Sequence, residues 1–367
     1  MNSILYIGFM TFLWVVNLFN GTGLGAAYRT TEYARLIVLA LAVLILMEKI
    51  RKEHGCYVQK RYFYELLALV LVFVTVSFGK GYRWMGLDYL WIFLIVFILS
   101  CAKPSRSVLR FVGLIYGSLG LMILLIYGYT DILSGWNPNS IAMIGLFSYL
   151  VFMIPYYGAR DFRSFLTLAM AGTVYAFLII PTESRSCIAT ILMALLFSFR
   201  ILSMESLLRS PAGVLAALLV PLGITGFSAI LSGSGVVESL NQWSLTELGK
   251  PVFNGRDVTW LEGFRQLKEN LLLGSGYISA GLWHNSAMAC LTAYGIVGYY
   301  LWIRLFHMII EDAEPHTADV CVMGSMSAFM IIYWQQSVEL GIFAPNPNVL
   351  PYAILGILLG RINRIKN

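Results

Sequence analysis

Hydrophobic residues are grouped along the chain in long runs, and short polar stretches separate one run from the next. A helix needs about 20 predominantly apolar residues to cross the hydrocarbon core of a bilayer, and several of these runs lie near the short end of that range. The first run lacks the basic flank and small-residue cleavage site of a signal peptide, so we expect it to be retained. The pattern predicts about twelve transmembrane helices, near residues 4–19, 34–47, 62–79, 87–102, 108–127, 139–157, 163–181, 186–202, 212–231, 286–306, 317–334 and 347–362.

The composition indicates a membrane protein and excludes a soluble one. Hydrophobic residues make up 59% and charged residues 12% of the 367 residues, and the mean hydropathy is +0.76. Charged residues form about a quarter of a typical soluble chain, so the bilayer has to be the solvent for most of this one. We therefore expect an all-α polytopic membrane protein. One larger loop at 232–285 separates a helical part at 1–231 from a second helical part at 286–367.

Lysine and arginine residues concentrate in alternate connections, and this sets the expected orientation. By the positive-inside rule these connections and both termini are cytoplasmic. The remaining connections, including 232–285, then face outward, which in a bacterium is the periplasm. The residues that give this signal are Lys49, Arg51, Lys52, Lys60, Arg61, Lys103, Arg106, Arg110, Arg160, Arg163, Arg200, Arg209, Arg304, Arg361, Arg364 and Lys366.

A second set of basic residues lies on the expected outer side, where the positive-inside rule does not explain it. We expect part of this set to face an anion. The set comprises Arg29, Arg35, Lys80, Arg83, Arg185, Lys250, Arg256, Arg265 and Lys268.

Two of these arginines stand where helices are expected to begin. Arg185 either snorkels to the membrane interface or points into an outward-facing cavity, where its donors suit phosphate oxygens. Arg256 follows Asn254 and Gly255 at the start of an amphipathic segment, where backbone N–H groups also favour anions. A solvated pair with the neighbouring Asp257 is the structural alternative for Arg256.

The amphipathic segment after Arg256 has an apolar residue every three or four positions, which is the period of one helical face. Arg265 lies off that face and is a candidate contact to substrate. A helix of this kind suits a membrane interface, with its charged side in water. The apolar positions are Val258, Leu261, Phe264, Leu267 and Leu271.

His284 precedes the next apolar run and is the only one of the four histidines on the expected outer side. An imidazole, with an ordinary pKa of about 6.5, suits proton transfer near neutral pH, although a lone histidine before an apolar helix also has a purely structural interpretation. Asn285 can orient a sugar hydroxyl or the imidazole, and Trp283 can stack on a sugar ring. Asn137 and Asn139 are first of all turn and cap residues, with carbohydrate hydrogen bonding as the alternative.

Other chemistry is not indicated by the sequence. The five cysteines are scattered and form no CxxC or CxxH spacing, so neither a disulfide framework nor a zinc site is expected. Walker, GxSxG and HExxH patterns and Asp-rich clusters are also missing from the sequence. We expect no cofactor, no metal ion and no nucleic-acid partner.

Three segments resemble, in the same order, the O-antigen ligase and polymerase family of bacterial envelope glycosyltransferases. They are GWNPNSIAM, ESRSCIATILMALL and the run GRDVTW…ENLLLGSGY…HNSAMACLTAYGIVGYYL. The third is the most specific and extends over about fifty residues. Members of that family often carry proline after Glu-Asn, where this chain has Leu271, and this departure alters a turn rather than a reacting group.

The resemblance implies a GT-C-like, metal-independent inverting glycosyltransferase of the bacterial inner membrane that acts at the periplasmic face. The implied donor is an undecaprenyl-pyrophosphate-linked oligosaccharide and the implied acceptor is a hydroxyl of a lipid-linked glycan. By this likeness Arg185 and Arg256 grip the pyrophosphate, and His284 is the general base or positions the acceptor. Membrane lipids and a chain-length regulator are further candidate partners.

Within this family we favour a polymerase, which joins the growing chain to another lipid-linked repeat unit, over a ligase, which transfers the chain to lipid A-core. Such polymerases are numerous and varied. A lipid-linked glycan transporter or flippase is the competing class. Transporters place ionisable residues and broken helices near the middle of the membrane. Here the notable polar residues gather at one face, which favours an enzyme.

Overall fold

The structure is a computed structural model, and it describes residues 3–21, 30–51, 60–82, 86, 88–158, 161–231, 234–278, 283–344 and 347–366. It is 81% helical, and the described residues form no strand. The high helical content confirms the all-α class predicted from the hydrophobic runs. Arg29 and Arg83, expected on the outer side, lie outside the described residues.

A helix lies at each of the apolar runs recognised in the sequence. These helices are α1 (Ser3–Gly21), α3 (Thr30–Arg51), α4 (Lys60–Gly79), α5 (Asp88–Ala102), α6 (Arg106–Tyr129), α7 (Pro138–Met153), α8 (Phe162–Ile179), α9 (Arg185–Ser198), α11 (Pro211–Leu231), α14 (Ser286–Ala313), α15 (Val320–Gln335) and α16 (Val349–Ile365). The described residues form three more α-helices, which are α10 (Met204–Leu208), α12 (Val236–Leu248) and α13 (Arg256–Glu269). Short 3-10 helices are η1 (Asp131–Leu133), η2 (Ile154–Tyr156), η3 (Ile180–Thr182) and η4 (Glu314–His316).

Six helices of the described part of the chain are long and apolar enough to cross a membrane. They are α1, α6, α7 with η2, α8 with η3, α11, and α14 with η4. Four shorter apolar helices, α4, α5, α9 and α15, accompany them. The transmembrane character of the chain is thus supported, and the total of twelve spans stays a prediction.

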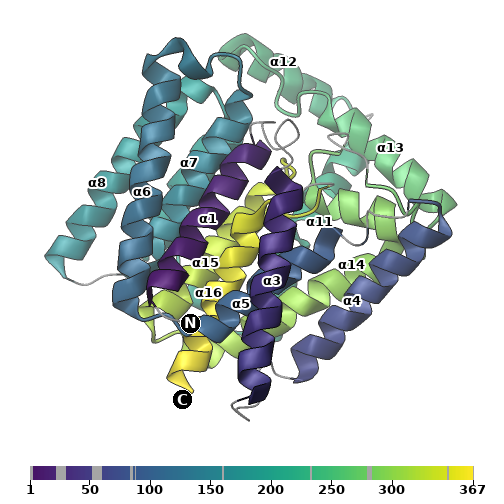
Figure 1. The fold of residues 1–367 in the computed structure, drawn as a ribbon. Coiled ribbons are helices and arrows are strands. Elements are labelled where there is room, and N and C mark those ends of the chain that lie inside the picture. The colour runs from purple at the N-terminus through teal and green to yellow at the C-terminus, as the bar shows by residue number, and fades with distance from the viewer. Residues whose placement is uncertain are drawn as a thin grey trace.

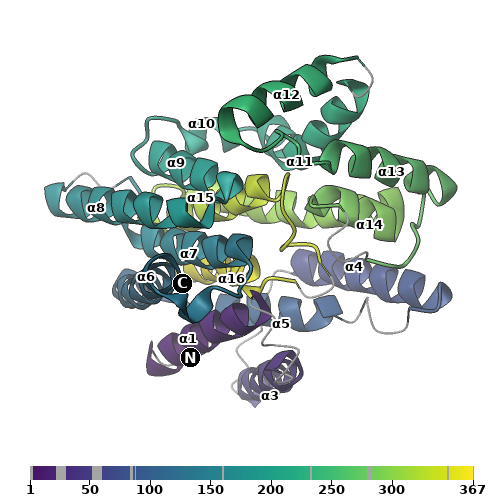
Figure 2. The same cartoon turned by 90° about the horizontal axis from the view of Figure 1, so that it is seen from above.

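The apolar helices form one bundle, and two helices lie across one of its ends (Figure 1). Those two are α12 and α13, and we refer to this end as the α12–α13 end. Both chain termini lie at the opposite end. Seen from above, α7, α15 and α16 occupy the interior, whereas α3 and α8 lie at the periphery (Figure 2). Side chains such as Leu44 and Phe177 on these peripheral helices are apolar and exposed, as expected where the surroundings are lipid.

Helix α14 is broken at Gly295, and the segment before it fills the break. Gly295 has φ 65° and ψ −168°, a conformation essentially confined to glycine. The freed N–H groups of Ile296 and Val297 donate to the carbonyls of Leu271 and Leu272 at 3.0 and 3.2 Å. In return, residues 275 and 276 donate to the carbonyls of residues 292 and 293 at 2.9 and 2.7 Å. Residues on both sides of the break in α14 are therefore bonded to residues 271–276.

Helix α13 confirms the predicted amphipathic helix, but its buried face differs from the expected one. Trp260, Gly263 and Leu267 are buried, whereas Val258 is 67% exposed. Gly263 lets α13 pack closely here, because a Cβ at this position would lie 2.9 Å from the sulfur of Met288, which would have to shift. Apolar residues on the exposed side of α13 suit a membrane interface. The helix ends at Glu269, before Leu271, and the preceding helix α12 was not predicted.

Candidate functional site

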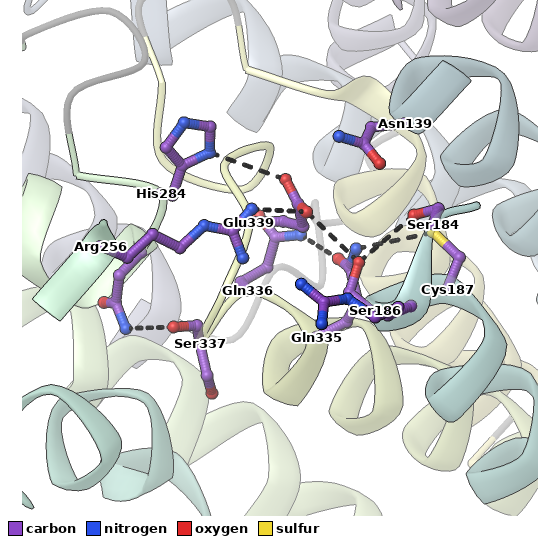
Figure 3. A network of polar contacts seen from close by, with 12 residues as sticks. Asn139, Ser184, Ser186, Cys187, Arg256, His284, Gln335, Gln336, Ser337 and Glu339 are labelled. Atoms are coloured by element: carbon purple, nitrogen blue, oxygen red, sulfur yellow. Dashed lines mark hydrogen bonds and ion pairs between the residues drawn. The ribbon is translucent and has the colours of Figure 1, made fainter. Parts of the chain in front are cut away.

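A buried carboxylate, Glu339, joins two of the three candidate catalytic residues. It lies in the connection between α15 and α16. Its Oε1 accepts a hydrogen bond from Nη2 of Arg256 at 3.2 Å, and its Oε2 lies 3.8 Å from Nδ1 of His284. Figure 3 shows Arg256 and His284 reaching this carboxylate from the same side. The structure therefore brings the predicted arginine and histidine together.

The site is buried at the carboxylate and open at the imidazole. The side chain of Glu339 is 8% exposed, that of Arg256 19% and that of His284 42%. Ser186, at the start of α9, also donates its hydroxyl to Oε1 of Glu339, at 3.3 Å. A buried carboxylate is costly unless it is paired and hydrogen-bonded, and these partners offset that cost. The exposed ring of His284 leaves one side of the site accessible.

Glu339 stands on a short loop, residues 336–342, that is bonded to itself. The side-chain oxygen of Gln336 accepts from the N–H of Ile342 at 2.9 Å, which closes the loop at its base. The same oxygen accepts from the hydroxyl of Ser286 at 3.1 Å. Tyr352 of α16 donates its hydroxyl to the carbonyl of Ile342 at 2.7 Å. The loop is thus fixed to the starts of both α14 and α16.

Tight turns place Arg256 and His284 at the beginnings of their helices. Asn254 and Gly255 have φ values of 52° and 78°, which turn the chain so that α13 begins at Arg256. His284 has φ 42° and is followed by Asn285, whose side chain caps α14. Asparagine and histidine are among the residues that tolerate this left-handed region.

Three helices begin around Glu339. Its partner Ser186 is the second residue of α9, Arg256 is the first residue of α13, and His284 stands two residues before α14. The N-cap residues of α9 and α13 are Ser184 and Gly255, and neither accepts a hydrogen bond from its helix through a side chain. A helix N-terminus carries about half an elementary positive charge. The surroundings of Glu339 therefore favour negative groups, even apart from the charge of Arg256.

The floor of the site is a buried network of neutral polar side chains. Gln336 donates to the side-chain oxygen of Gln335 at 2.5 Å, and Gln335 contacts the sulfur of Cys187 at 3.9 Å. Ser184 and Ser186 lie 3.5 Å apart through their hydroxyls. Figure 3 shows this network continuing from Glu339 to α9. A satisfied buried network of this kind holds its members in one arrangement.

Asn285 is fully buried and its side chain is engaged in holding the backbone. Its amide donates to the carbonyls of Pro221 and Ser337 at 2.9 and 2.8 Å, and its oxygen accepts from the N–H of Met288 at 2.9 Å. The side chain thus ties α11, the Glu339 loop and α14 together. This placement gives Asn285 a positioning role and leaves no part of it facing a sugar.

Trp283 is also buried rather than presented to a ligand. Its carbonyl accepts a hydrogen bond from Nε1 of Trp260 at 2.5 Å, and both indoles are buried. The bond joins α13 to the residue directly before His284. The structure therefore gives Trp283 a packing role in place of the expected stacking on a sugar ring.

Arg185 begins α9 next to the cluster, but its guanidinium turns to the loop that precedes α13. It donates to the carbonyls of Lys250 and Pro251 at 3.3 and 2.8 Å. Lys250 in turn pairs with Glu183, and its hydrogen bond and charge lower the pKa of that carboxyl. Arg185 thus holds the loop at the edge of the site, and it does not contact Glu339.

Arg265 is not brought to the cluster. It lies nine residues after Arg256, about two and a half helical turns, and so projects from the opposite side of α13. Its side chain is 63% exposed and pairs with Glu262 and Glu269 at 2.7 and 3.1 Å. The hydrogen bonds from Arg265 lower the pKa of Glu262 to about 2. The expectation that Arg265 contacts substrate therefore has no support in its position.

The two asparagines before α7 differ in position. Asn137 is exposed and caps α7, accepting from the N–H of Asn139 at 2.9 Å, as turn chemistry predicts. Asn139 is half-buried, and Figure 3 shows it across from Glu339 and Ser184. Figure 3 thus places Asn139 beside the cluster.

Glu339 was missed from the sequence, although one signal pointed to it. The segment QQSVEL interrupts an apolar region with three consecutive polar residues and an acid. Nothing in the local pattern shows that Glu339 meets Arg256 and His284, which lie 83 and 55 positions earlier in the chain. Within the described residues, no group of three or more His, Cys, Asp or Glu side chains is placed to hold a metal ion.

Comparisons with protein-family models and with curated proteins gave no match to this chain.

Proposed function

We propose that the protein is a bacterial polysaccharide polymerase of the inner membrane. It would transfer a glycan from an undecaprenyl-pyrophosphate carrier to a sugar hydroxyl of a lipid-linked repeat unit at the periplasmic face. One observation carries this proposal: Arg256, His284 and Glu339 converge among three helix N-termini at one end of an apolar bundle.

The first support is the affinity of this arrangement for an anion. Of the five N–H donors of a guanidinium, the contact to Glu339 engages Nη2 of Arg256. The remaining donors and the helix starts can meet phosphate oxygens. As the sugar C1–O bond breaks, negative charge accumulates on the leaving pyrophosphate, and donors already in place stabilise that charge. Arg185 acts in this proposal by holding the loop that ends at Arg256.

The second support is the position of an exposed imidazole beside the anion site. In an inverting transfer the acceptor oxygen attacks the anomeric carbon while the bond to the pyrophosphate breaks. The acceptor loses its proton to His284, and the carrier leaves as the pyrophosphate. A positioned base of this kind contributes about 10²–10⁴-fold to the rate. No ATP and no nucleotide sugar is needed, because the donor is already activated.

The third support comes from the location of the site. Both substrates carry lipid tails, so an enzyme for them has to work at a membrane surface. The exposed apolar side of α13 suits such an interface. The break in α14 is a feature shared with transporters, but its freed backbone groups bond to residues 271–276 rather than lining a cavity.

The test uses protein reconstituted into liposomes with a lipid-linked repeat unit extracted from cells that lack the gene. Arg256→Ala should lower the rate of polymer formation on the order of 10²–10³-fold, the usual effect of removing one such donor. Arg265→Ala, on the opposite side of the same helix, is the matched control. Polymer formed at the wild-type rate by Arg256→Ala would refute the proposal.

The class of acceptor is decided in cells. In a deletion strain, core capped with a single repeat unit identifies a polymerase. Bare core, with long polymer retained on the carrier lipid, identifies a ligase. An unchanged ladder of surface polysaccharide would exclude both and favour the transporter.

A further inference from the structure

We infer that Glu339 is a positioning residue that couples donor binding to activation of His284, an inference that rests on the proposed function. In the structure, one oxygen of Glu339 holds Arg256 and the other faces His284. When a pyrophosphate binds, Arg256 turns to the phosphate, and the carboxylate is left to orient the imidazole.

The geometry assigns the two oxygens different tasks. Oε1 accepts from Arg256 at 3.2 Å and from Ser186 at 3.3 Å, whereas Oε2 faces Nδ1 of His284 at 3.8 Å. The last distance is too long for a full hydrogen bond, and a contact of this kind can tighten when substrate binds. Loss of Arg256 from Oε1 leaves Ser186 to hold the carboxylate in place while its charge becomes available to His284.

A carboxylate opposite Nδ1 determines which ring nitrogen can act as the base. It favours the tautomer with the proton on Nδ1, so that Nε2 is left with a free lone pair. When Nε2 accepts the acceptor's proton, the ring becomes a cation and the carboxylate stabilises it. Glu339 itself exchanges no proton with substrate.

The order of events follows from the charges. Before the donor binds, Arg256 neutralises Glu339, and the carboxylate attracts His284 weakly. A pyrophosphate carries more negative charge than one carboxylate, so it displaces Glu339 from Arg256. The N-termini of the neighbouring helices attract the same negative charge. The base is therefore fully activated only in the enzyme that already holds its donor, which prevents proton abstraction without a leaving group.

The other ionisable groups around Glu339 are few in the described part of the chain. Arg256 approaches from α13 and His284 from the segment before α14. From α9, Cys187 lies in the adjoining polar network, and Arg185 turns to the loop at 250–251. Any pH dependence that Glu339 imposes on catalysis thus acts through His284.

Glu339→Gln separates this role from a structural one. The glutamine has nearly the same shape, and its carbonyl can still accept from Arg256 and Ser186. Its NH₂ group, however, would face Nδ1 of His284 and favour the opposite tautomer, with Nε2 protonated and unable to act as a base. The substitution also removes the negative charge that competes with phosphate for Arg256.

The experiment measures binding of inorganic pyrophosphate and the initial rate of transfer between pH 5.5 and 9, with purified Glu339→Gln, Glu339→Asp, His284→Ala and the double variant Glu339→Gln/His284→Ala. We expect Glu339→Gln to bind pyrophosphate at least as tightly as wild type while transfer falls on the order of 10²-fold. The double variant should be no slower than His284→Ala alone, because the two residues act as one unit. Glu339→Asp, which keeps the charge, should recover part of the rate and the wild-type pH profile.

Different results overturn different statements. A wild-type rate and pH profile for Glu339→Gln, or rate losses that multiply in the double variant, would overturn the coupling role and leave the proposed function intact. Weaker pyrophosphate binding by Glu339→Gln would show a structural role instead. Full activity of Arg256→Ala would remove the proposed function itself.

Discussion

Replacing Gly295 by alanine should destabilise the protein, because the break in α14 depends on this glycine. This backbone conformation is less favourable by about 1–3 kcal/mol of free energy for a residue that carries a side chain. In addition, a Cβ at this position would lie 2.3 Å from the carbonyl carbon and oxygen of Leu272 and 2.5 Å from the nitrogen of Leu273. The segment 271–276 would have to move away.

That movement also affects hydrogen bonding inside the bundle. The N–H groups of Ile296 and Val297 bond to the carbonyls of Leu271 and Leu272. Each bond contributes about 0.5–1.5 kcal/mol. Adding the backbone cost to the loss of both bonds gives a destabilisation of about 2–6 kcal/mol. This is a large fraction of the roughly 5–15 kcal/mol by which domains are typically stable.

The assay heats detergent-solubilised protein and follows the folded fraction by size-exclusion chromatography. The matched control is Gly226→Ala in α11, because a Cβ at Gly226 would meet no atom within 4 Å. Gly226→Ala should melt at the wild-type temperature or slightly above, since alanine is the better helix former. Equal melting temperatures for the two variants would refute the reasoning.

Three further predictions concern charged groups away from the cluster. Arg265→Ala should leave the transfer rate within about twofold of wild type, because this arginine projects from the far side of α13; a large loss in the liposome assay would contradict this. Asp319 caps α15 and pairs with Arg361 at 2.6 Å, so Asp319→Ala should melt lower than Asp319→Asn, which keeps a capping oxygen. Burial opposes the ionised form of Asp319, but Arg361 and two backbone N–H groups together lower its pKa. The ionised carboxylate therefore stabilises the fold fully above the ordinary aspartate pKa of about 4, and this stabilisation is lost as the pH falls through the lowered pKa. The melting temperature of Asp319→Asn should depend less on pH below about 4 than that of the wild type.

The hydrophobic pattern predicted where the helices lie, but it did not predict their internal geometry. Apolar runs mark helices because a helix in lipid satisfies its own backbone, whatever its neighbours are. The break at Gly295 depends instead on residues 271–276, which supply the missing partners. Local sequence cannot distinguish that glycine from those in unbroken helices, such as Gly226.

The candidate site was predicted in part for a similar reason. Arg256 and His284 could be recognised because each is a polar residue at the expected start of a helix. Glu339 could not, because its importance arises from burial against segments far away in the chain. Asn285 and Trp283 lie on either side of His284, and their burial gives them structural partners where ligand contacts were expected.

The closed loop that carries Glu339 has a consequence for timing. Gln336 and Tyr352 fix both ends of that loop, so the carboxylate stays in place while its partners change. The exchange then requires only rotation about the side-chain bonds of Arg256 and His284. The ring of His284 is exposed, and rotations of exposed side chains take picoseconds to nanoseconds, whereas enzymes turn over about 1–10³ times per second. Under the proposed function, rotation of His284 at Glu339 is therefore far too fast to limit turnover, and the slow step would lie in the release of Arg256, in the chemistry or in the movement of the lipid-linked chains.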